Sequence, residues 1–238
     1  MYFLFSGEGP TDLGECTDNA MQCDGQDYRY GPMTVIVSQI VEEQHKYSLL
    51  DTNNYGFVTK GTLSKRKSEL NPAKKKIRLR GKKRGKETRY FFNNARVLAR
   101  IAKERAAKLN DEVVAVLFRD SDNTASAGRG LWSDKRQSML DGFTEEGFPR
   151  GVPMIPKPKS EAWIICAVKN SYAGCDTLEN RSGNDDSPNS LKSELKKHLG
   201  ELPGREVLCQ MVTDRTIDVR QIKMSSFVAF QTRLEEVI

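Results

Sequence analysis

The chain has 238 residues, of which 37% are hydrophobic, with a mean hydropathy of −0.60 and a formal net charge of +6. This length allows one sizeable core, and no apolar stretch approaches the roughly 20 residues that a membrane-spanning helix needs. The apolar run at residues 2–5 is too short, and lacks the basic leader, to be a secretion signal. The composition excludes a helical membrane protein and predicts a soluble, polar one.

Predicted strands and helices alternate along the first half of the chain. Residues 2–5 read as an apolar strand, and a loop rich in Gly, Asp and Cys runs to about residue 30. Apolar residues at helical spacing predict a helix over 31–45. Residues 55–59 are expected to form a second strand before a basic loop, and an amphipathic helix is expected from about 92 to 109.

The alternation continues in the second half of the chain. Residues 113–118 are a continuous apolar run of strand length, which is typical of a parallel strand buried on both faces. Ser133 can cap a helix, and Ser160 opens the helical stretch EAWIICAVK. The other predicted elements are a strand at 152–155, a loop at 170–190 and helices near 190–199 and 215–235.

This order of elements predicts an α/β fold with a mainly parallel sheet flanked by helices. We expect one domain over residues 1–170, with a basic insertion at 60–89. Residues 171–238 are expected to form a loop and a helical C-terminal extension that packs on the same core. In such sheets, ligands bind beyond the carboxyl ends of the strands, where the strand order reverses.

The five cysteines are scattered, odd in number and without a Cys-x-x-Cys pair. We therefore expect free thiols rather than a disulfide framework, which fits a reducing cytoplasm. The cysteines are Cys16, Cys23, Cys166, Cys175 and Cys209.

The positive charge is concentrated in one segment. Residues 60–89 carry 14 Lys and Arg against two acids, a net charge of +12, so the rest of the chain carries −6. A nucleic-acid backbone attracts such a run, because each neutralised phosphate releases a counterion; a solvated loop is the alternative. The residues expected to contact nucleic acid are Lys74, Lys75, Lys76, Arg78, Arg80, Lys82, Lys83 and Arg84.

Two acidic motifs follow predicted strands. YFLFSGEGPTD, at residues 2–12, carries Glu8 and Asp12, and VLFRDSDNT, at residues 116–124, carries Asp120 and Asp122. If the two strands are neighbours, these carboxylates converge on one edge of the sheet and need a cation to offset their repulsion. Without His or Cys beside them, they favour Mg²⁺ or Mn²⁺, and such ions activate water for phosphodiester cleavage.

The motifs FSGEGPTD and FRDSDNT resemble the two signature motifs of the Toprim domain, which occurs in topoisomerases, primases, recombination proteins and overcoming-lysogenization-defect (OLD) nucleases. The form GEGPTD is similar to stand-alone and OLD-like Toprim proteins, many of them from bacterial antiphage defence loci. The resemblance covers roughly residues 1–168 and implies a Rossmann-like Toprim fold and a metal-dependent nuclease acting on DNA or RNA.

The resemblance also implies the roles of individual residues. Glu8, Asp120 and Asp122 would be metal ligands, and Asp12 a further one. The stretch KPKSEAWI supplies the best match to a third acidic site of this class, with Glu161 as a ligand and Lys159 as a phosphate-contacting cation. The chain departs from the OLD pattern because it has no Gly-x-x-x-x-Gly-Lys-Ser/Thr loop, so an ATPase would be a separate partner protein.

Other interpretations of the same acids stay open. Asp12 and Asp122 could be turn or helix caps, and Glu161 could be a first-turn acid favoured by the helix dipole. VLFRDSDNT also fits the haloacid-dehalogenase pattern, with Asp120 as a nucleophile, although that family places its motif on the first strand and here more than 110 residues precede it. A Toprim-like scaffold that binds nucleic acid or a partner without cleaving is the third interpretation.

Overall fold

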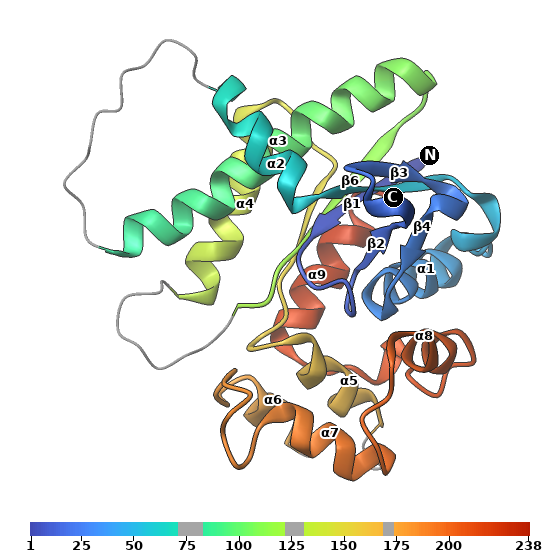
Figure 1. The fold of residues 1–238 in the computed structure, drawn as a ribbon, viewed down its shortest axis with the longest axis vertical. Coiled ribbons are helices and arrows are strands. Elements are labelled where there is room, and N and C mark those ends of the chain that lie inside the picture. The colour runs from blue at the N-terminus through green and yellow to red at the C-terminus, as the bar shows by residue number, and fades with distance from the viewer. Residues whose placement is uncertain (71–82, 122–130, 169–173) are drawn as a thin grey trace.

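The computed structural model describes residues 1–70, 83–121, 131–168 and 174–238. Within these ranges a mainly parallel sheet has the strand order β3-β5-β1-β6-β7, in which only the edge strand β3 is antiparallel (Figure 1). The strands are β1 (Tyr2–Gly7), β3 (Gln22–Asp24), β5 (Tyr55–Thr59), β6 (Val113–Phe118) and β7 (Gly151–Met154). The predicted α/β fold with a mainly parallel sheet is confirmed.

Both faces of the central strands are buried. Along β1, Phe3 and Phe5 belong to the apolar core on one face, while Tyr2 and Leu4 belong to the core on the other face. Side chains alternate in the same way along β6, whose six residues are all buried. This is the burial that the continuous apolar run at residues 113–118 predicts for a central parallel strand.

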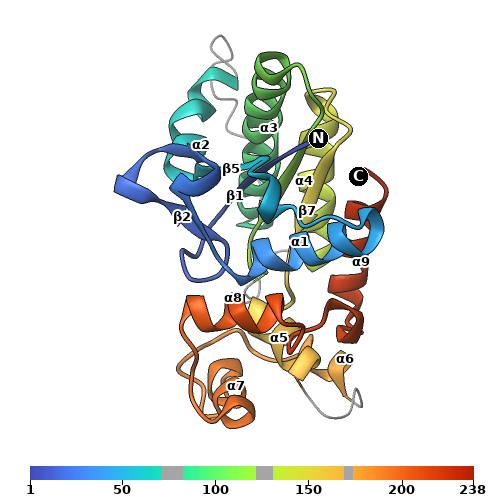
Figure 2. The same cartoon turned by 90° about the vertical axis from the view of Figure 1, so that its right-hand side faces the viewer.

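Helices cover both faces of the sheet (Figures 1 and 2). On one face, α1 (Pro32–His45) and α9 (Ser225–Glu235) pack against Phe3 and Phe5. The other face is covered by α2 (Lys60–Arg66), α3 (Lys83–Leu109) and α4 (Trp132–Glu145). Helix α3 is longer than the predicted helix at 92–109 and begins inside the basic segment.

Four more helices lie together at one end of the molecule, at the bottom of Figures 1 and 2. They are α5 (Ser160–Val168), α6 (Cys175–Leu178), α7 (Leu191–Leu199) and α8 (Arg205–Thr213). Trp163 of α5 is fully buried, stacks on Phe230 at 5.7 Å between ring centroids and donates a hydrogen bond to Ser226 Oγ at 2.9 Å. Apolar residues from 175 to 237 belong to the same core as α1 and β1.

The predicted loop between the first strand and residue 30 is partly wrong. This segment contains β3 and an antiparallel pair, β2 (Gly14–Cys16) with β4 (Tyr28–Tyr30). Tyr28 holds the pair on the sheet, because its hydroxyl donates to Leu13 O at 2.5 Å and its ring stacks on Phe57 at 5.0 Å. Strands of three residues are too short to show a hydrophobic period in the sequence.

The C-terminal helices also differ from the prediction. The expected helix at 215–235 is divided into a short 3₁₀ helix, η5 (Val219–Gln221), and α9, and α8 precedes them without having been predicted. Gln39 of α1 fixes the break, since its side-chain amide donates to Val212 O at 2.7 Å and accepts from the Val219 N–H at 2.7 Å. These long-range contacts have no signature in the local sequence.

The expectation of free cysteines is wrong for four of the five. Disulfides join Cys16 to Cys23 and Cys166 to Cys175, and Cys209 is free. Each bridge links two elements that the fold brings together, β2 with β3 and α5 with α6, an arrangement that cysteine counting does not reveal. The inference from free thiols to a reducing cytoplasm therefore loses its basis. Among the described helices, none is long and apolar enough to span a membrane.

Candidate functional site

The strands that carry the two acidic motifs are neighbours. β1 and β6 pair in parallel, with Gly7 opposite Phe118, so Glu8 and Arg119 leave the sheet side by side. The chain passes from β1 to β5 on one side and later to β6 and β7 on the other, so the strand order reverses between β1 and β6. The condition for convergence is met: both motifs lie beyond the carboxyl ends of adjacent strands, at the switch point where such folds bind ligands.

Three carboxylates from distant parts of the chain surround Ser160, the first residue of α5. The Ser160 hydroxyl donates to Asp12 Oδ1 at 2.5 Å, and the Ser160 N–H donates to Asp120 Oδ1 at 3.1 Å. Glu161 Oε2 lies 3.5 Å from the same hydroxyl oxygen. Ser160 is itself buried. The structure therefore brings Asp12, Asp120 and Glu161 together, and the convergence includes a serine that the sequence marked only as a helix start.

Backbone pairing beyond the sheet brings α5 to this place. The Arg119 N–H donates to Met154 O at 3.0 Å, and the Ser121 N–H donates to Pro156 O at 3.1 Å. These bonds continue the β6–β7 ladder past the end of β6. The chain that leaves β7 thus runs beside Asp120, and the Ser160 N–H donates to the Asp120 carboxylate.

A tight turn brings Asp12 to the same group. Gly9 has φ of 83°, a left-handed conformation that glycine adopts without steric cost, and its carbonyl accepts from the Asp12 N–H at 3.0 Å. The Asp12 carbonyl in turn accepts from the Met33 N–H at the start of α1, at 3.0 Å. The turn after β1 is therefore anchored at both sides of Asp12, which directs its carboxylate toward α5.

Burial makes the Asp12 and Glu161 carboxylates hard to ionise. It raises the pKa of Asp12, and it raises the pKa of Glu161, where the nearby Asp12 carboxylate adds to the effect. Lys159 and Lys192 oppose these shifts, and their Nζ atoms bind Asp185 at 3.0 and 2.6 Å. Partly buried carboxylates with raised pKa values at a strand end are a functional-site signal.

Glu8 lies in a different environment from the other acids. Its Oε2 atom is 2.9 Å from Arg119 Nη1 and 3.2 Å from Lys60 Nζ. Arg119 also donates to the Tyr90 hydroxyl at 2.8 Å and stacks over the Tyr90 ring. The sequence did not predict the contacts of Glu8 with Lys60 and of Arg119 with Tyr90, because α2 and α3 reach this place only through the fold.

Several predicted site residues lie outside the described part of the chain. Asp122 is one of them, so the predicted distance between the Glu8 and Asp122 carboxylates stays a prediction. Lys83 and Arg84 begin α3, but their side chains are not among those described. The remaining predicted nucleic-acid contacts outside the described residues are Lys74, Lys75, Lys76, Arg78, Arg80 and Lys82.

The donor set around Ser160 suits a hard cation. All of its ligating atoms are oxygens, which Mg²⁺ and Mn²⁺ prefer, and a cation would offset the repulsion between Asp12 and Glu161. Within the described residues, however, no three His, Cys, Asp or Glu side chains are grouped closely enough to hold a metal ion. Asp12, Asp120 and Glu161 meet at Ser160 without forming such a group, and Glu8 is paired with Arg119 and Lys60 instead.

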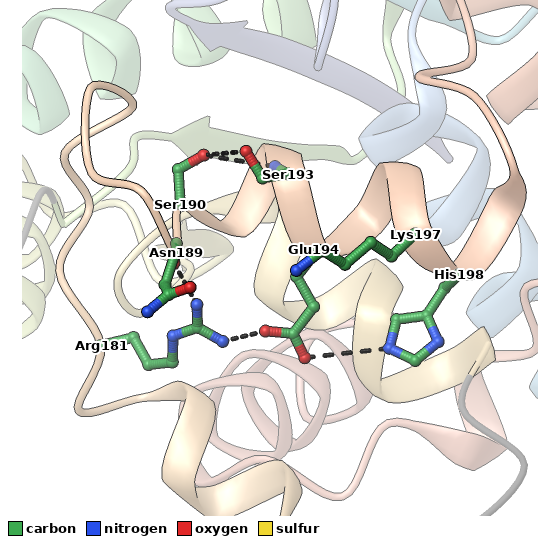
Figure 3. Close-up of a pocket in the computed structure, with 7 residues that line it drawn as sticks. All are labelled: Arg181, Asn189, Ser190, Ser193, Glu194, Lys197 and His198. Carbon is green, nitrogen blue, oxygen red and sulfur yellow. Dashed lines mark hydrogen bonds and ion pairs between the residues drawn. The ribbon is translucent and has the colours of Figure 1, made fainter.

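A cavity of about 510 Å³ lies apart from this group, beside α7 (Figure 3). Glu194 forms an ion pair with Arg181, and its other carboxylate oxygen lies 3.8 Å from His198 Nε2. None of the predicted site residues lines it. The lining residues are Arg181, Asn189, Ser190, Ser193, Glu194, Lys197 and His198.

Comparison with known proteins gives little further guidance. No protein-family model matches the chain, and no curated protein matches it. Among solved structures, a candidate GDSL-like lipase from Parabacteroides merdae aligns with 90% of this chain and 94% of its own, at 13% sequence identity and a TM-score of 0.33. A likeness at that level carries no argument about activity, so function has to be inferred from the site itself.

Proposed function

We propose that the chain is a Toprim-type nuclease that uses Mg²⁺ or Mn²⁺ to cleave phosphodiester bonds in nucleic acid. One observation carries this proposal: Asp12, Asp120 and Glu161 converge on Ser160 beyond the switch point between β1 and β6. Carboxylate oxygens favour Mg²⁺ or Mn²⁺ over softer metals. Such a cation can activate water and stabilise the leaving oxygen in phosphodiester cleavage. The basic segment at 60–89 supplies a reason for a polyanionic substrate.

The residues of the chain have distinct roles in this proposal. Asp12, Asp120 and Glu161 would hold the cation, with Glu8 and Asp122 as further ligands. A bound divalent cation would activate water and stabilise the leaving oxygen. Ser160 orients the carboxylates by donating to two of them, and Asp12 and Glu161 must lose their protons before they can bind metal.

Two parts of the proposal concern the setting rather than the chemistry. The resemblance to OLD-like Toprim proteins supports a role as the effector of a bacterial antiphage defence system, in the cytoplasm, with a separate ATPase as partner. Lys159 directly precedes α5, and its amine donates to Asp185 at 3.0 Å. In this proposal Lys159 contacts a substrate phosphate beside the three carboxylates. Cleavage of labelled DNA and RNA with Mg²⁺, Mn²⁺ or chelator, with and without a candidate ATPase, tests the proposal.

A scaffold that binds nucleic acid without cleaving it is the second candidate. It is favoured by the incomplete ligand set among the described residues and by the ion pairs that hold Glu8 on Arg119 and Lys60. The cleavage assay separates the two candidates. If the wild-type protein binds nucleic acid but leaves every substrate intact with either metal and with the ATPase, the scaffold is the better account.

Replacing six cations of the basic segment is expected to weaken nucleic-acid binding and to flatten its dependence on salt. Each lost phosphate contact lowers the slope of log affinity against log salt by about 0.9 for duplex DNA. Folding stability should hardly change, because exposed charges contribute little. The measurement is a salt titration of binding, and the six residues changed to Gln are Lys74, Lys75, Lys76, Lys82, Lys83 and Arg84.

A control variant carries the same loss of charge elsewhere on the surface. Its six exposed lysines, also changed to Gln, are Lys46, Lys103, Lys108, Lys196, Lys197 and Lys223. The control should keep most of the salt dependence. If both variants lose the same fraction of the slope, the basic segment makes no special phosphate contacts and acts only through net charge.

A further inference from the structure

Three cations from separate parts of the chain lie close together near Tyr90 of α3. Lys67, in the short 3₁₀ helix η4 (Lys67–Leu70), places Nζ 4.2 Å from the centre of the Tyr90 ring. Arg119, which follows β6, places its guanidinium carbon 4.3 Å from the same ring centre. Lys60, the first residue of α2, joins Arg119 on the Glu8 carboxylate. We name Lys60, Lys67 and Arg119 the cation cluster.

Among the described residues, the ion pairs of the cation cluster neutralise only part of its positive charge. Within the described part of the chain, the ion pairs of Lys60 and Arg119 lead to a single carboxylate, that of Glu8. Lys67 is partly buried, and this burial together with the nearby Arg119 and Lys60 lowers the pKa of its amine. Three cations are thus held close together, at a cost in mutual repulsion that an added anion would relieve.

A buried amide next to the cluster points to a bound molecule. Lys60, Tyr90 and Arg119 line a cavity of about 10 Å³, close to the space of one water molecule. Asn94 lines it too, and its buried Oδ1 accepts no hydrogen bond from the described residues. A water in this cavity could donate one proton to Asn94 Oδ1 and the other to an anion held by the cations.

We propose that the cation cluster is a phosphate-binding site that takes a backbone phosphate of nucleic acid. The identity of the ligand rests on the proposed function. Guanidinium and ammonium groups are the side chains that bind phosphate best, and Arg119 is followed directly by Asp120. A phosphate on the cluster would therefore lie at the same edge of the sheet as the carboxylates around Ser160. The incoming phosphate competes with Glu8 for Arg119 and Lys60, which releases Glu8 toward the adjacent acids.

The first test compares Lys67 with Lys65, a nearby lysine of the same charge that lies outside the cation cluster. Lys67→Gln removes one member of the cluster, and Lys65→Gln removes an exposed lysine of α2 outside it. Binding of fluorescein-labelled single-stranded and duplex oligonucleotides is measured in chelator, so that cleavage plays no part. Loss of one charge-assisted hydrogen bond should raise the Kd of Lys67→Gln about tenfold, and the Kd of Lys65→Gln less than about twofold.

Glu8→Gln gives a change of opposite sign. Removing the internal carboxylate leaves the cluster without its competitor, so oligonucleotides should bind this variant several-fold more tightly than the wild type in chelator. A general loss of folding could not produce tighter binding. Equal Kd values for Glu8→Gln and the wild type would mean that phosphate does not displace Glu8.

The second test uses the wild-type protein. Acylation of lysine amines, mapped by mass spectrometry, should label Lys67, and a saturating oligonucleotide should protect it at least fivefold while Lys65 stays reactive. Protection by inorganic phosphate alone, equal to that by the oligonucleotide, would overturn the assignment to nucleic acid in favour of free phosphate. Unprotected Lys67, with equal Kd values for Lys67→Gln and Lys65→Gln, would overturn the site.

These outcomes are separate from those that decide the proposed function. A protein that cleaves with Mg²⁺ while Lys67→Gln and Lys65→Gln bind alike is a nuclease without this phosphate site. A protein that never cleaves, yet loses affinity and protection at Lys67, has the phosphate site on a binding scaffold. The two proposals can therefore fail independently.

Discussion

Asp120→Asn is expected to lower Mg²⁺-dependent cleavage of nucleic acid by about 10³-fold while leaving the fold intact. The asparagine keeps an oxygen that can accept the Ser160 N–H, now made at 3.1 Å, but it loses the negative charge. A cation held by so few carboxylates is not easily retained without one of them, since Mg²⁺ dehydrates reluctantly. Loss of a single preorganised electrostatic group commonly costs about 10²–10³ in rate.

The matched control for this variant is Asp214→Asn. Asp214 is exposed and also accepts one backbone N–H, that of Thr216 at 3.0 Å, but it lies in the turn after α8. Cleavage by the control should equal that of the wild type, and circular dichroism should be unchanged in both variants. Cleavage by Asp120→Asn at the rate of the control would remove Asp120 from the metal site.

Glu161→Gln is expected to make the metal-free protein more stable at pH 7 while abolishing most of its activity. Burial raises the pKa of Glu161, so the folded state holds this proton more tightly than the unfolded chain does. Stability therefore falls as pH rises from the ordinary carboxyl pKa, about 4.3, through the raised value. Glutamine removes that loss, and we expect Tm at pH 7 to rise by roughly 2–4 °C, the shift that about 1 kcal/mol produces in a domain of this size.

The pH dependence gives the sign of this effect a direct check. The Tm advantage of Glu161→Gln should shrink as pH is lowered and vanish below the unfolded pKa, where both proteins are uncharged at this position. Added Mg²⁺ should raise the Tm of the wild type and not that of the variant, because the ion binds only the folded state. Glu145→Gln, at an exposed position in α4, should show neither behaviour. A lower Tm for Glu161→Gln at pH 7 in chelator would contradict the account.

Much of the fold was predictable because it is written in local hydrophobic patterns. The apolar runs at 2–5, 55–59 and 113–118 are long enough to be read as buried strands, and each is one. The spacing of strands and helices then predicts a parallel sheet, and the structure makes β1 and β6 neighbours. That adjacency is why acids in two motifs more than 100 residues apart lie beyond the same edge.

The finer features of the site were not predictable from single motifs. Ser160 looks like an ordinary helix start, and its contacts to Asp12 and Asp120 depend on the backbone pairing of Arg119 and Ser121 with Met154 and Pro156, which brings the chain before α5 beside Asp120. The place of Glu8 among cations depends on α2 and α3 reaching the same edge. Contacts between residues so far apart in the chain leave no pattern in the local sequence.

The disulfides were not predictable from the sequence either. Their number and spacing argued for free thiols, yet the fold brings Cys16 close to Cys23 and Cys166 close to Cys175, with Cα atoms 5.7 and 5.3 Å apart. Pairing is decided by which elements lie side by side in the fold. Counting residues along the chain cannot decide it.

Anomalous scattering from Mn²⁺ in crystals of the wild-type protein tests the central claim most directly. The account predicts an anomalous peak within about 2.5 Å of carboxylate oxygens of Asp120 and of at least one of Asp12 and Glu161. The same peak should be absent from crystals of Asp120→Asn grown under the same conditions. No peak at these carboxylates in crystals saturated with Mn²⁺, with Asp12 and Asp120 still bound to Ser160, would contradict the metal site and the nuclease built on it.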